Sequence, residues 1–440
     1  MGHEQLIAKL EAKRARVGVI GLGYVGLPLA VSFAEAGFDV VGFEVDGDKA
    51  AALNRGESYI LDVEAAEVAR LVDAGKFRAT TDFDELSSCD ALSVCVPTPL
   101  RKTRDPDLTY VISATEQIKS RLRAGQLVVL ESTTYPGTTI EVVAPTLCET
   151  GLNVGEDVFI AFSPERIDPG NPLYGVKNTP KIVGGVTPRC NAAAAALYGA
   201  IVDKVISVSS PTAAEMVKLL ENTFRAVNIG LVNEIAIIAN KLGLDVWEVI
   251  DAAASKPFGF MPFYPGPGLG GHCIPIDPHY LSWKLRTLNY KTRFIELADD
   301  INSHMPEYVV DKVGQALNED GKPIKGAKVL VLGVAYKRNI TDWRESPAAP
   351  VIEGLIRRGG DVSYHDDFVP EFALGHGGEA EHLHSVPLDY SDLGRYDCVV
   401  IVTDHTYLDA EQVVANARRI VDTRNLVGKA GITSEKVVKL

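Results

Sequence analysis

The sequence predicts an α/β protein with two doubly wound domains joined by a long central helix. Three observations predict this fold. Short apolar runs alternate with helical segments over the first 208 residues, a helical stretch follows, and a partial copy of the opening pattern begins near residue 328. At about 150 residues per domain, a chain of 440 residues corresponds to about three domains. We therefore expect domains at residues 1–208, 209–318 and 319–440.

The first domain begins with a strand, a glycine turn, a helix and a second strand. The predicted helix spans residues 27–36, with Pro28 in its opening turn, where a missing N–H costs least, and Gly37 at its end. The predicted strands are residues 17–20, 39–43, 91–96, 127–130 and 158–162. Strands that alternate with helices in this way form a mostly parallel sheet covered by helices.

The middle of the chain is predicted to be helical. Residues 211–242 read as one helix of about 30 residues, long enough to bridge two domains and to offer a face for dimerisation. We therefore expect a helical dimerisation domain between residues 209 and 318. Residues 257–278 are rich in glycine and proline and cannot form regular structure, and loops of that length are usually functional.

The third domain repeats part of the first. Residues 328–333 are similar to residues 16–21, with an offset of 312 (333 minus 21). Residues 360–362 are similar to residues 38–40, with an offset of 322 (361 minus 39). About ten extra residues therefore lie between the two strands of the copy.

These extra residues replace the glycine turn. The replacing segment is residues 334–345, and Ser346 and Pro347 follow it as the expected cap and first turn of the next helix. We expect the copy to keep the fold and to bind a different ligand.

A glycine turn follows the first predicted strand. It has the pattern G-x-G-x-x-G, it opens a helix, and Glu44 ends the second strand about 20 positions later. Gly21 permits a tight turn, Gly23 lets backbone amides approach a pyrophosphate, and Gly26 allows close packing of helix on strand. Glu44 would accept hydrogen bonds from a ribose diol, which favours NAD, and Asp46 competes for this role. The pattern predicts a Rossmann-like NAD site rather than an ordinary βαβ turn.

Polar residues follow two further predicted strands, where open α/β sheets bind ligands. Residues 132–134 are Ser-Thr-Thr and residues 164–166 are Pro-Glu-Arg. On the long helix, Lys218 and Asn222 are four residues apart and share one face. A cation beside an amide offers two donors to a developing oxyanion. The alternative, which spacing alone favours, is a solvated helix face.

One of the six cysteines differs from the others. Glycines beside Cys273 allow a ligand to approach its sulfur, and Asp277 lies four residues further on. His272 is expected to be a loop side chain with no catalytic role. The remaining five, expected to be small packing residues, are Cys89, Cys95, Cys148, Cys190 and Cys398.

The composition excludes several classes of protein. With 46% hydrophobic residues and a net charge of -14, the chain is too apolar to be disordered and lacks the basic field of a nucleic-acid binder. The cysteines lack metal-ligand spacing, and His376, His382 and His384 lie in a predicted exposed loop, so we expect no metal and a reducing cytoplasm. The N-terminus lacks the apolar stretch of a signal peptide, and the longest apolar run, 192–202, is too short to span a membrane.

Together these motifs are similar to those of the UDP-glucose/GDP-mannose dehydrogenase family of nucleotide-sugar 6-dehydrogenases. The resemblance extends from about residue 16 to about residue 425 and involves all three domains. Its motifs are G-x-G-Y-V-G-L-P at 21–28, Glu131-Ser132-Thr133, Ser163-Pro164-Glu165-Arg166, Lys218 with Asn222, Gly270-Gly271-His272-Cys273 with Asp277, and Gly333, Tyr336-Lys337 and Arg344-Glu345-Ser346.

The resemblance implies a four-electron oxidation of a C6 primary alcohol by NAD. The aldehyde would be held by Cys273 as a thiohemiacetal, oxidised to a thioester and hydrolysed to the carboxylate. Glu165 would act as general base, and Thr133 would position the C6 oxygen or a water. The implied catalytic residues are Cys273, Lys218, Asn222, Asp277, Glu165 and Thr133.

The resemblance also implies two binding sites, one for NAD in the first domain and one for a UDP-sugar in the third. The implied cofactor contacts are Gly21, Gly23, Tyr24, Val25, Gly26, Glu44, Pro97, Thr98, Thr133 and Arg344. The implied substrate contacts are Glu165, Arg166, Lys218, Asn222, Phe263, Tyr264, Gly270, Tyr336 and Lys337, and Arg344 also fits a pyrophosphate. We expect a homodimer or higher homo-oligomer that uses the central helix.

Within the family the chain looks most like the bacterial UDP-N-acetylglucosamine 6-dehydrogenase branch, which implies a role in making O-antigen or capsule. Arg166 stands where the UDP-glucose branch has an apolar residue. We therefore expect UDP-N-acetylglucosamine as substrate, with UDP-glucose and the galacto and manno epimers as alternatives. A 3-hydroxy acid dehydrogenase would not need the third domain, and a non-catalytic nucleotide sensor would not need Cys273.

Overall fold

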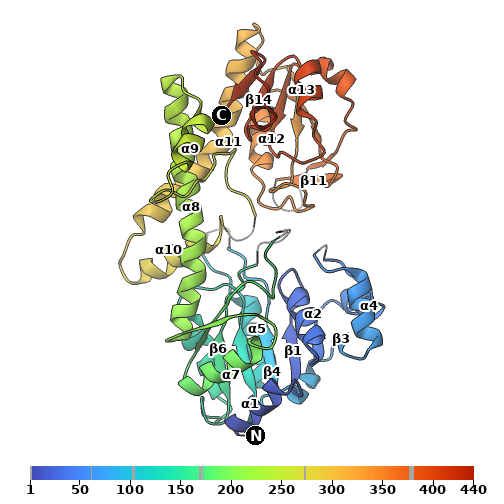
Figure 1. Ribbon diagram of the computed structural model, residues 1–440, viewed down its shortest axis with the longest axis vertical. Helices are drawn as coiled ribbons and strands as arrows, with labels where there is room; N and C mark the ends of the chain where they lie inside the picture. The colour runs from blue at the N-terminus through green and yellow to red at the C-terminus, as the bar shows by residue number, and fades with distance from the viewer. Residues whose placement is uncertain are drawn as a thin grey trace. The chain divides into compact units, whose positions relative to one another are not determined.

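The computed structural model describes residues 2–60, 62–101, 105–167, 171, 173–271, 274–375 and 381–440, and these form two compact units (Figure 1). Unit 1 consists of residues 1–221 and 279–290, and unit 2 of residues 222–278 and 291–440. The helix α8, Pro211–Leu242, has the predicted bounds and continues from unit 1 into unit 2. The predicted central domain is therefore shared between the two units.

Unit 1 contains an eight-stranded sheet in the order β3-β2-β1-β4-β5-β6-β7-β8. The first six strands are parallel, and β7 and β8 run in the opposite direction. Its strands are β1 Arg16–Ile20, β2 Asp39–Phe43, β3 Phe77–Thr80, β4 Ala91–Val94, β5 Leu127–Leu130, β6 Phe159–Phe162, β7 Lys181–Gly185 and β8 Val205–Val208. Its helices are α1 His3–Glu11, α2 Gly26–Ala36, α3 Gly47–Asn54, α4 Ala65–Asp73, η1 Phe83–Ser88, α5 Thr109–Lys119, η2 Thr139–Val143, α6 Ala144–Cys148 and α7 Pro188–Tyr198.

Helices cover both faces of this sheet. Leu127 and Val129 of β5 lie in the hydrophobic cluster that contains α2 and α7. Val128 and Leu130 lie in the cluster that contains α5 and α6. Side chains alternate along a strand, so a strand buried on both faces must be apolar throughout, as β5 is. The predicted doubly wound architecture is confirmed, and β3, β7 and β8 are strands that the sequence did not reveal.

Unit 2 contains a five-stranded parallel sheet in the order β10-β9-β13-β14-β15 and a separate two-stranded sheet. Its strands are β9 Lys328–Leu332, β10 Asp361–His365, β11 Glu371–Leu374, β12 Glu381–His384, β13 Cys398–Ile401, β14 Ile420–Asp422 and β15 Val437–Lys439. Its other helices are α9 Val246–Ala254, α11 Arg293–Glu319, α12 Ala348–Arg357, η3 Tyr390–Arg395, α13 Ala410–Asn416 and α14 Leu426–Lys429, and α10 Asp277–Thr287 begins in this unit.

The predicted repeat is visible in the register of the strands. Arg16 pairs with Asp39 in unit 1, and Lys328 pairs with Asp361 in unit 2. The two pairs differ by 312 (328 minus 16) and by 322 (361 minus 39), which are the offsets found in the sequence. The copy therefore keeps the same pair of parallel strands and lengthens the connection between them.

The starts of β1, α2 and β6 differ from the predictions by one residue each, and three further details also differ. Strand β4 ends at Val94, two residues before the predicted end. The loop predicted over residues 257–278 ends where Asp277 opens α10. Pro347, not Ser346, is the cap of α12, although the Ser346 hydroxyl accepts a hydrogen bond from the Ala348 N–H at 3.2 Å. Among the described residues no helix is long and apolar enough to cross a membrane.

Two glycines of the first turn provide a matched test of packing. A Cβ on Gly26 would lie 1.8 Å from the Gly21 carbonyl oxygen, whereas a Cβ on Gly23 would meet nothing within 4 Å. We expect Gly26→Ala to lower the apparent melting temperature, with a cost of about 1–3 kcal/mol or more, because the backbone must move. Gly23→Ala should leave it unchanged in calorimetry. Equal effects of the two substitutions would contradict this account.

Candidate active site

The glycine turn of unit 1 lies between β1 and β4, where the strand order reverses. Open α/β sheets bind ligands at this point. Gly21 adopts a φ of 87°, and a Cβ there would lie 2.8 Å from the Cys95 carbonyl oxygen after β4. Gly23 and Tyr24 are exposed, so a ligand has access to this backbone. Glycine thus suits each of the three positions for a different physical reason: the positive φ at Gly21, ligand access at Gly23 and close packing at Gly26.

The structure separates the two candidates for the ribose carboxylate. Glu44 is half-buried at the end of β2 and accepts a hydrogen bond from the Leu22 N–H of the glycine turn at 3.2 Å. Asp46 caps α3, because its carboxylate accepts from the Asp48 and Lys49 N–H groups. Glu44 is therefore joined to the cofactor turn, whereas Asp46 already has a structural role.

The other predicted cofactor contacts follow β4 and β5. Pro97 is exposed and Thr98 is half-buried after β4, and the Tyr280 hydroxyl donates to the Thr98 carbonyl at 2.6 Å. Thr133 is half-buried two residues after Glu131, the first residue beyond β5. The carboxyl ends of neighbouring parallel strands meet at one sheet edge, so these segments share an edge with the glycine turn.

Four polar contacts hold the Glu165 segment in place after β6. The Lys218 ammonium of α8 donates to the Glu165 carbonyl at 2.6 Å. The Arg166 guanidinium binds Glu221 of α8 through two nitrogens and donates to the Pro180 carbonyl at 2.6 Å. Only 8% of Lys218 is exposed, so it is not part of a solvated helix face. Arg166, predicted to contact substrate, is already engaged with α8.

A buried ion cluster lies beside Glu165. The Lys181 ammonium at the start of β7 donates to Glu131 at 2.6 Å and to Glu165 at 3.2 Å. Burial alone would raise the pKa of Glu165, but attraction to Lys181, the Ile167 N–H and Lys218 outweighs burial and lowers it. Burial raises the pKa of Glu131 more than Lys181 lowers it. Sequence reasoning missed Lys181, whose only signal is a lysine at the start of an apolar strand.

In unit 2, Asn222 and Asp277 are brought together. The Asn222 amide donates to the Asp277 carboxylate, which is 3% exposed at the first position of α10. The predicted nucleophile Cys273 and its neighbour His272 lie outside the described residues. The structure therefore describes the Asn222–Asp277 pair, whereas the role of Cys273 beside it stays a prediction.

The loop that leads to Cys273 packs on the start of the inserted segment. A Cβ on Gly270 would lie 2.7 Å from the Tyr336 Cβ, and one on Gly271 would lie 2.9 Å from the Tyr336 ring. Only glycine allows this approach. Phe263 is half-buried and packs against Phe224, with ring centroids 5.7 Å apart. The contact of Gly270 and Gly271 with Tyr336 joins two parts of the chain that the sequence motifs had singled out separately.

Tyr264 packs against helix α9. Its ring stacks on Trp247 of α9 with centroids 5.7 Å apart, and its hydroxyl donates to Asp251 at 2.8 Å. The hydrogen bond to Asp251 raises the pKa of Tyr264, and burial raises it further. The resemblance implies that Tyr264 contacts substrate, and the structure shows that its ring also packs on a helix.

Cations gather at the carboxyl ends of β13 and β14, the corresponding edge of the second sheet. Arg338 and Lys429 both pair with Asp404, and Arg424 donates to the Val402 carbonyl at 2.9 Å. Lys337 is half-buried nearby in sequence, and the exposed Arg344 binds Asp342 through two nitrogens. Sequence reasoning missed Arg424 and Lys429, although their position after a strand was a usable signal.

Unit 2 also keeps an acidic residue where unit 1 has Glu44. Asp366 follows β10 at the offset of 322 (366 minus 44) and is 1% exposed. It accepts from the N–H groups of Val334 and Ala335 at 2.7 and 3.0 Å, and from His405 at 3.0 Å. Because the Asn339 N–H donates to His405 Nδ1, the ring proton is on Nε2 and points at Asp366.

The structure also shows the surroundings of other cysteines and of the histidines in the predicted loop. Burial raises the pKa of Cys89 to about 11 and that of Cys398 to about 12, so both thiols stay protonated. Cys148 was wrongly expected to pack, because it ends α6 and points to solvent. His382 and His384 are exposed as expected but belong to β12, whereas His376 lies outside the described residues. In the described part of the chain no group of acidic, histidine and cysteine residues could hold a metal.

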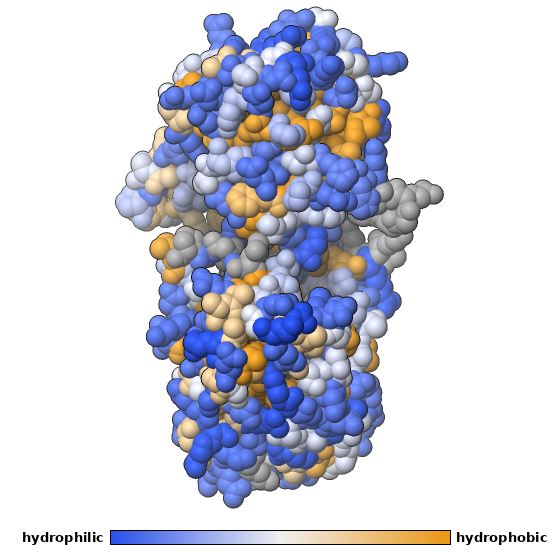
Figure 2. Space-filling view, turned by 90° about the vertical axis from the view of Figure 1, so that its right-hand side faces the viewer, coloured by the Kyte–Doolittle hydropathy of each residue, from blue (hydrophilic) through white to orange (hydrophobic). Residues whose placement is uncertain are grey.

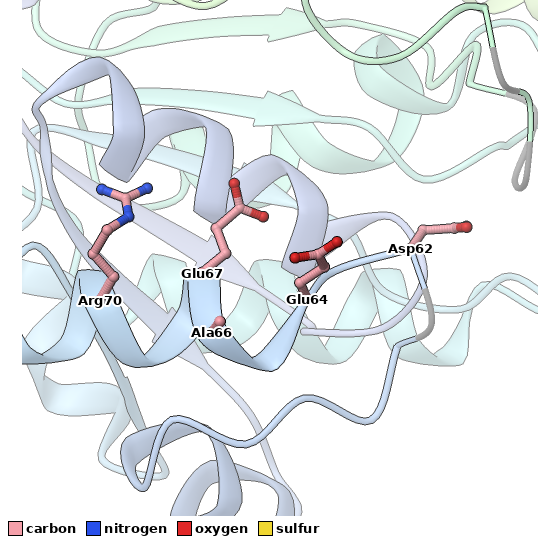
Figure 3. A pocket seen from close by; sticks show the side chains of 5 residues that line it. All are labelled: Asp62, Glu64, Ala66, Glu67 and Arg70. Atoms are coloured by element: carbon pink, nitrogen blue, oxygen red, sulfur yellow. The ribbon is translucent and has the colours of Figure 1, made fainter.

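A hollow on unit 1 lies away from all predicted site residues (Figure 3). Its lining residues are Asp62, Glu64, Ala66, Glu67 and Arg70. Figure 3 shows Glu67 and Arg70 standing up from α4, and Arg70 pairs with Glu35 of α2 at 2.6 Å. Since carboxylates dominate the lining, the hollow does not suit a diphosphate.

Three segments of the chain match successive domains of the UDP-glucose/GDP-mannose dehydrogenase family. Residues 15–202 match its NAD binding domain, residues 212–304 its central domain, and residues 330–429 its UDP binding domain. The matches together cover most of the chain and include all the regions described above.

Individual relatives give the same result. The chain is 36% identical over 397 residues to UDP-N-acetyl-D-glucosamine 6-dehydrogenase of Pseudomonas aeruginosa, covering 90% of this chain and 91% of the relative. It is 34% identical to UDP-N-acetyl-D-mannosamine dehydrogenase of Pyrococcus horikoshii, with 94% and 96% coverage. A solved structure of UDP-D-ManNAc dehydrogenase from Pyrococcus horikoshii aligns with a TM-score of 0.85 and 33% identity, covering 96% of this chain and 97% of that chain.

The two acidic residues after β2 can be distinguished by substitution. We expect Glu44→Ala to weaken NAD binding by roughly 10-fold or more, because a charged hydrogen-bond acceptor is lost. Asp46→Ala should leave NAD affinity unchanged and reduce stability by about 1 kcal/mol through loss of the α3 cap. Titration calorimetry with NAD and thermal unfolding measure the two effects. Weaker binding in the Asp46 variant alone would reverse the assignment.

Proposed function

The chain belongs to the UDP-glucose/GDP-mannose dehydrogenase family, and we propose that it oxidises the C6 alcohol of a UDP-N-acetylhexosamine, UDP-N-acetylglucosamine first, to the uronic acid. Members of this family are NAD-dependent nucleotide-sugar dehydrogenases, and its NAD binding domain lies in this chain. The observation that carries the proposal is the continuous match to all three domains, including the UDP binding domain. A 3-hydroxy acid dehydrogenase is thereby set aside.

The choice of sugar rests on the relatives. Those of Pseudomonas aeruginosa and Salmonella typhi are named for N-acetylglucosamine, at 36% and 34% identity. The relative of Pyrococcus horikoshii is named for N-acetylmannosamine. All three names specify an N-acetylated UDP-sugar, so the epimer is the point to test. UDP-N-acetylgalactosamine and UDP-glucose are the further alternatives.

The chain's residues suit the NAD that the family uses. Gly23 leaves the backbone open to a pyrophosphate, and the half-buried Glu44 has a carboxylate for the ribose diol. Tyr24 and Val25 of the turn, with Pro97, Thr98 and Thr133 after β4 and β5, would complete the contacts. When bound, NAD supplies the hydride acceptor for each of the two oxidations.

The protein's own groups would perform the remaining chemistry. Cys273 would add to the aldehyde at C6 and keep it bound until a thioester can be hydrolysed. Lys218 and Asn222 would donate to the C6 oxygen, with Asp277 orienting the Asn222 amide to which it is bonded. Glu165 would accept a hydrogen bond from the attacking water. These roles come from the family resemblance, position by position.

Anion-binding groups of unit 2 would hold the UDP part. Arg424 and Lys429 join the predicted Lys337 and Arg344 as donors for the diphosphate, which explains how a chain of net charge -14 binds such a ligand. Tyr336, which packs under Gly270 and Gly271, would hold the active-site loop against this domain. Local cations replace a favourable overall charge.

The surface of α8 supports a homo-oligomer. Phe224, Leu231, Ile238 and Leu242 are between 44% and 66% exposed and recur at intervals of seven, seven and four residues along one helix face. The face shown in Figure 2 is mainly hydrophilic and also carries apolar patches. A row of exposed apolar side chains on a helix marks a protein interface. We propose that a second copy of the chain covers it.

The reaction itself can be counted. We expect two NADH per UDP-N-acetylglucosamine consumed, because alcohol oxidation to a carboxylate removes four electrons. Cys273→Ser should abolish carboxylate formation, since an alkoxide is not available at neutral pH to hold the aldehyde. Absorbance and product mass spectrometry across the four UDP-sugars and GDP-mannose measure both. One NADH per sugar with a free aldehyde would exclude this function.

The proposed interface on α8 can be tested by introducing a charged residue into it. Leu231→Asp should dissociate the oligomer into monomers, because a carboxylate would be buried without a partner. Leu173→Asp is the matched control, because Leu173 is 73% exposed and does not belong to α8. Light scattering coupled to gel filtration gives the masses. A monomeric wild-type protein, or an oligomer that survives the Leu231 change, would contradict the assignment.

A further inference from the structure

A buried lysine is paired with two carboxylates in unit 1 and has no role in the chemistry above. Lys181 has 8% of its side chain exposed, Glu131 has none, and Glu165 has 14%. These groups and Tyr198 come from four separate elements: the ends of β5 and β6, the start of β7 and the end of α7. A lysine is almost never buried unless it is paired, so this arrangement has a specific cause.

The anchor of Lys181 is complete. Its ammonium donates to Glu131 Oε2 at 2.6 Å and lies 5.2 Å from the centre of the Tyr198 ring. The Tyr198 hydroxyl donates to the other oxygen of Glu131 at 2.5 Å and lies 3.3 Å from the Ser93 hydroxyl. Glu131 is thus held from both sides, and it fixes the ammonium that faces Glu165.

The Glu165 carboxylate is fixed at both oxygens. Its Oε1 accepts from the N–H groups of Arg166 and Ile167 at 2.8 and 2.7 Å. Its Oε2 accepts from Lys181 at 3.2 Å. A carboxylate oxygen has two lone pairs, so Oε2 retains one acceptor position after the Lys181 bond. The carboxylate cannot rotate without breaking one of these contacts.

A small cavity lies beside this carboxylate. Its lining includes Glu165, Lys181 and Thr179, and among the described residues the buried Thr179 hydroxyl has no hydrogen-bond partner. Apolar side chains make up most of the lining, and the unused Thr179 hydroxyl and the unused carboxylate lone pair are polar groups there that can hold one water. The fixed carboxylate therefore faces a place suited to a water.

We propose that Lys181 is a positioning residue: its ammonium, anchored by Glu131 and Tyr198, holds the Glu165 carboxylate in one orientation so that the free lone pair of Oε2 accepts from the water that hydrolyses the thioester. The proposal rests on the proposed function for its chemistry. Lys181 itself touches neither substrate nor cofactor in this account. It acts through Glu165.

Charge gives the proposal a measurable consequence. Among the described residues, the ionisable groups around Glu165 include Lys181 from β7, Lys218 from α8, Glu131 after β5, Tyr198 on α7, Cys95 after β4 and the neighbouring Arg166, which is paired with Glu221. Lys181 is the largest of the influences that lower the pKa of Glu165 against the effect of burial. Removing the ammonium should therefore raise that pKa, and removing Glu131 should lower it, because a like charge is lost.

The enzymatic test compares two opposite substitutions. We expect Lys181→Met to move the acid limb of the kcat profile to higher pH by about one to three units and Glu131→Gln to move it to lower pH. In Lys181→Met the covalent adduct at Cys273 should accumulate, seen by intact-protein mass, because hydrolysis slows by about 10-fold or more while the first oxidation continues. Lys181→Arg should restore both measurements. An unshifted acid limb in Lys181→Met, with wild-type turnover, would overturn the proposal.

A second measurement needs no activity. Glu165 has a lowered folded-state pKa, so its stabilising contribution is present above the unfolded pKa and is lost as pH falls through the folded pKa. In Lys181→Met this loss should begin at a higher pH than in the wild type and in Lys181→Arg, as measured by melting temperature against pH. Identical profiles for Met and Arg would overturn the proposal. If wild-type protein oxidises no nucleotide sugar, the proposed function fails, and these profiles still decide whether Lys181 holds Glu165.

Discussion

Both sheets depend on one constraint: a backbone turn must pass within van der Waals distance of the next strand where the strand order reverses. Gly21 meets the Cys95 carbonyl in this way, and Gly333 meets the Thr403 carbonyl, with calculated Cβ approaches of 2.8 and 2.5 Å. Both residues have a φ above 80°. Only glycine, which has a hydrogen in place of a side chain, meets both requirements. Glycine therefore determines the position of each turn and of the segments that follow the neighbouring strands.

Burial of charge is the second feature of the structure, and the chain manages it by pairing. Lys181 with Glu131 and Glu165, and Asp404 with Arg338 and Lys429, are clusters in which each buried charge has an opposite partner. Burying such groups costs several kcal/mol per ion before pairing. They are thus poor sources of stability, and their value lies in fixing the orientation of carboxylates at the sheet edge.

The sequence could predict what depends on periodicity and on glycine. Strand β5 was found with its bounds because it is apolar throughout, and helix α8 because apolar residues recur at helical spacing along it. Strand β7 was missed because it begins with a lysine whose partners, Glu131 and Glu165, are distant in sequence. The stacking of Tyr264 on Trp247 was not foreseen for a similar reason, since it depends on the path of the chain. Side-chain partners across elements leave no local pattern.

The two acidic residues at the same offset show why the copy binds a different ligand. Glu44 accepts from the Leu22 N–H of the glycine turn on one oxygen and from the Val45 and Asp46 N–H groups on the other, but it is only half-buried, so a ribose can still reach it. Asp366 is 1% exposed, and Val334, Ala335 and His405 donate to one of its oxygens while Phe368 donates to the other. A ribose diol therefore has no access to it. The lengthened turn of unit 2 uses its acid to fold itself, and the groups proposed to bind an anion in that unit are instead the arginines and lysine that follow β9 and β14.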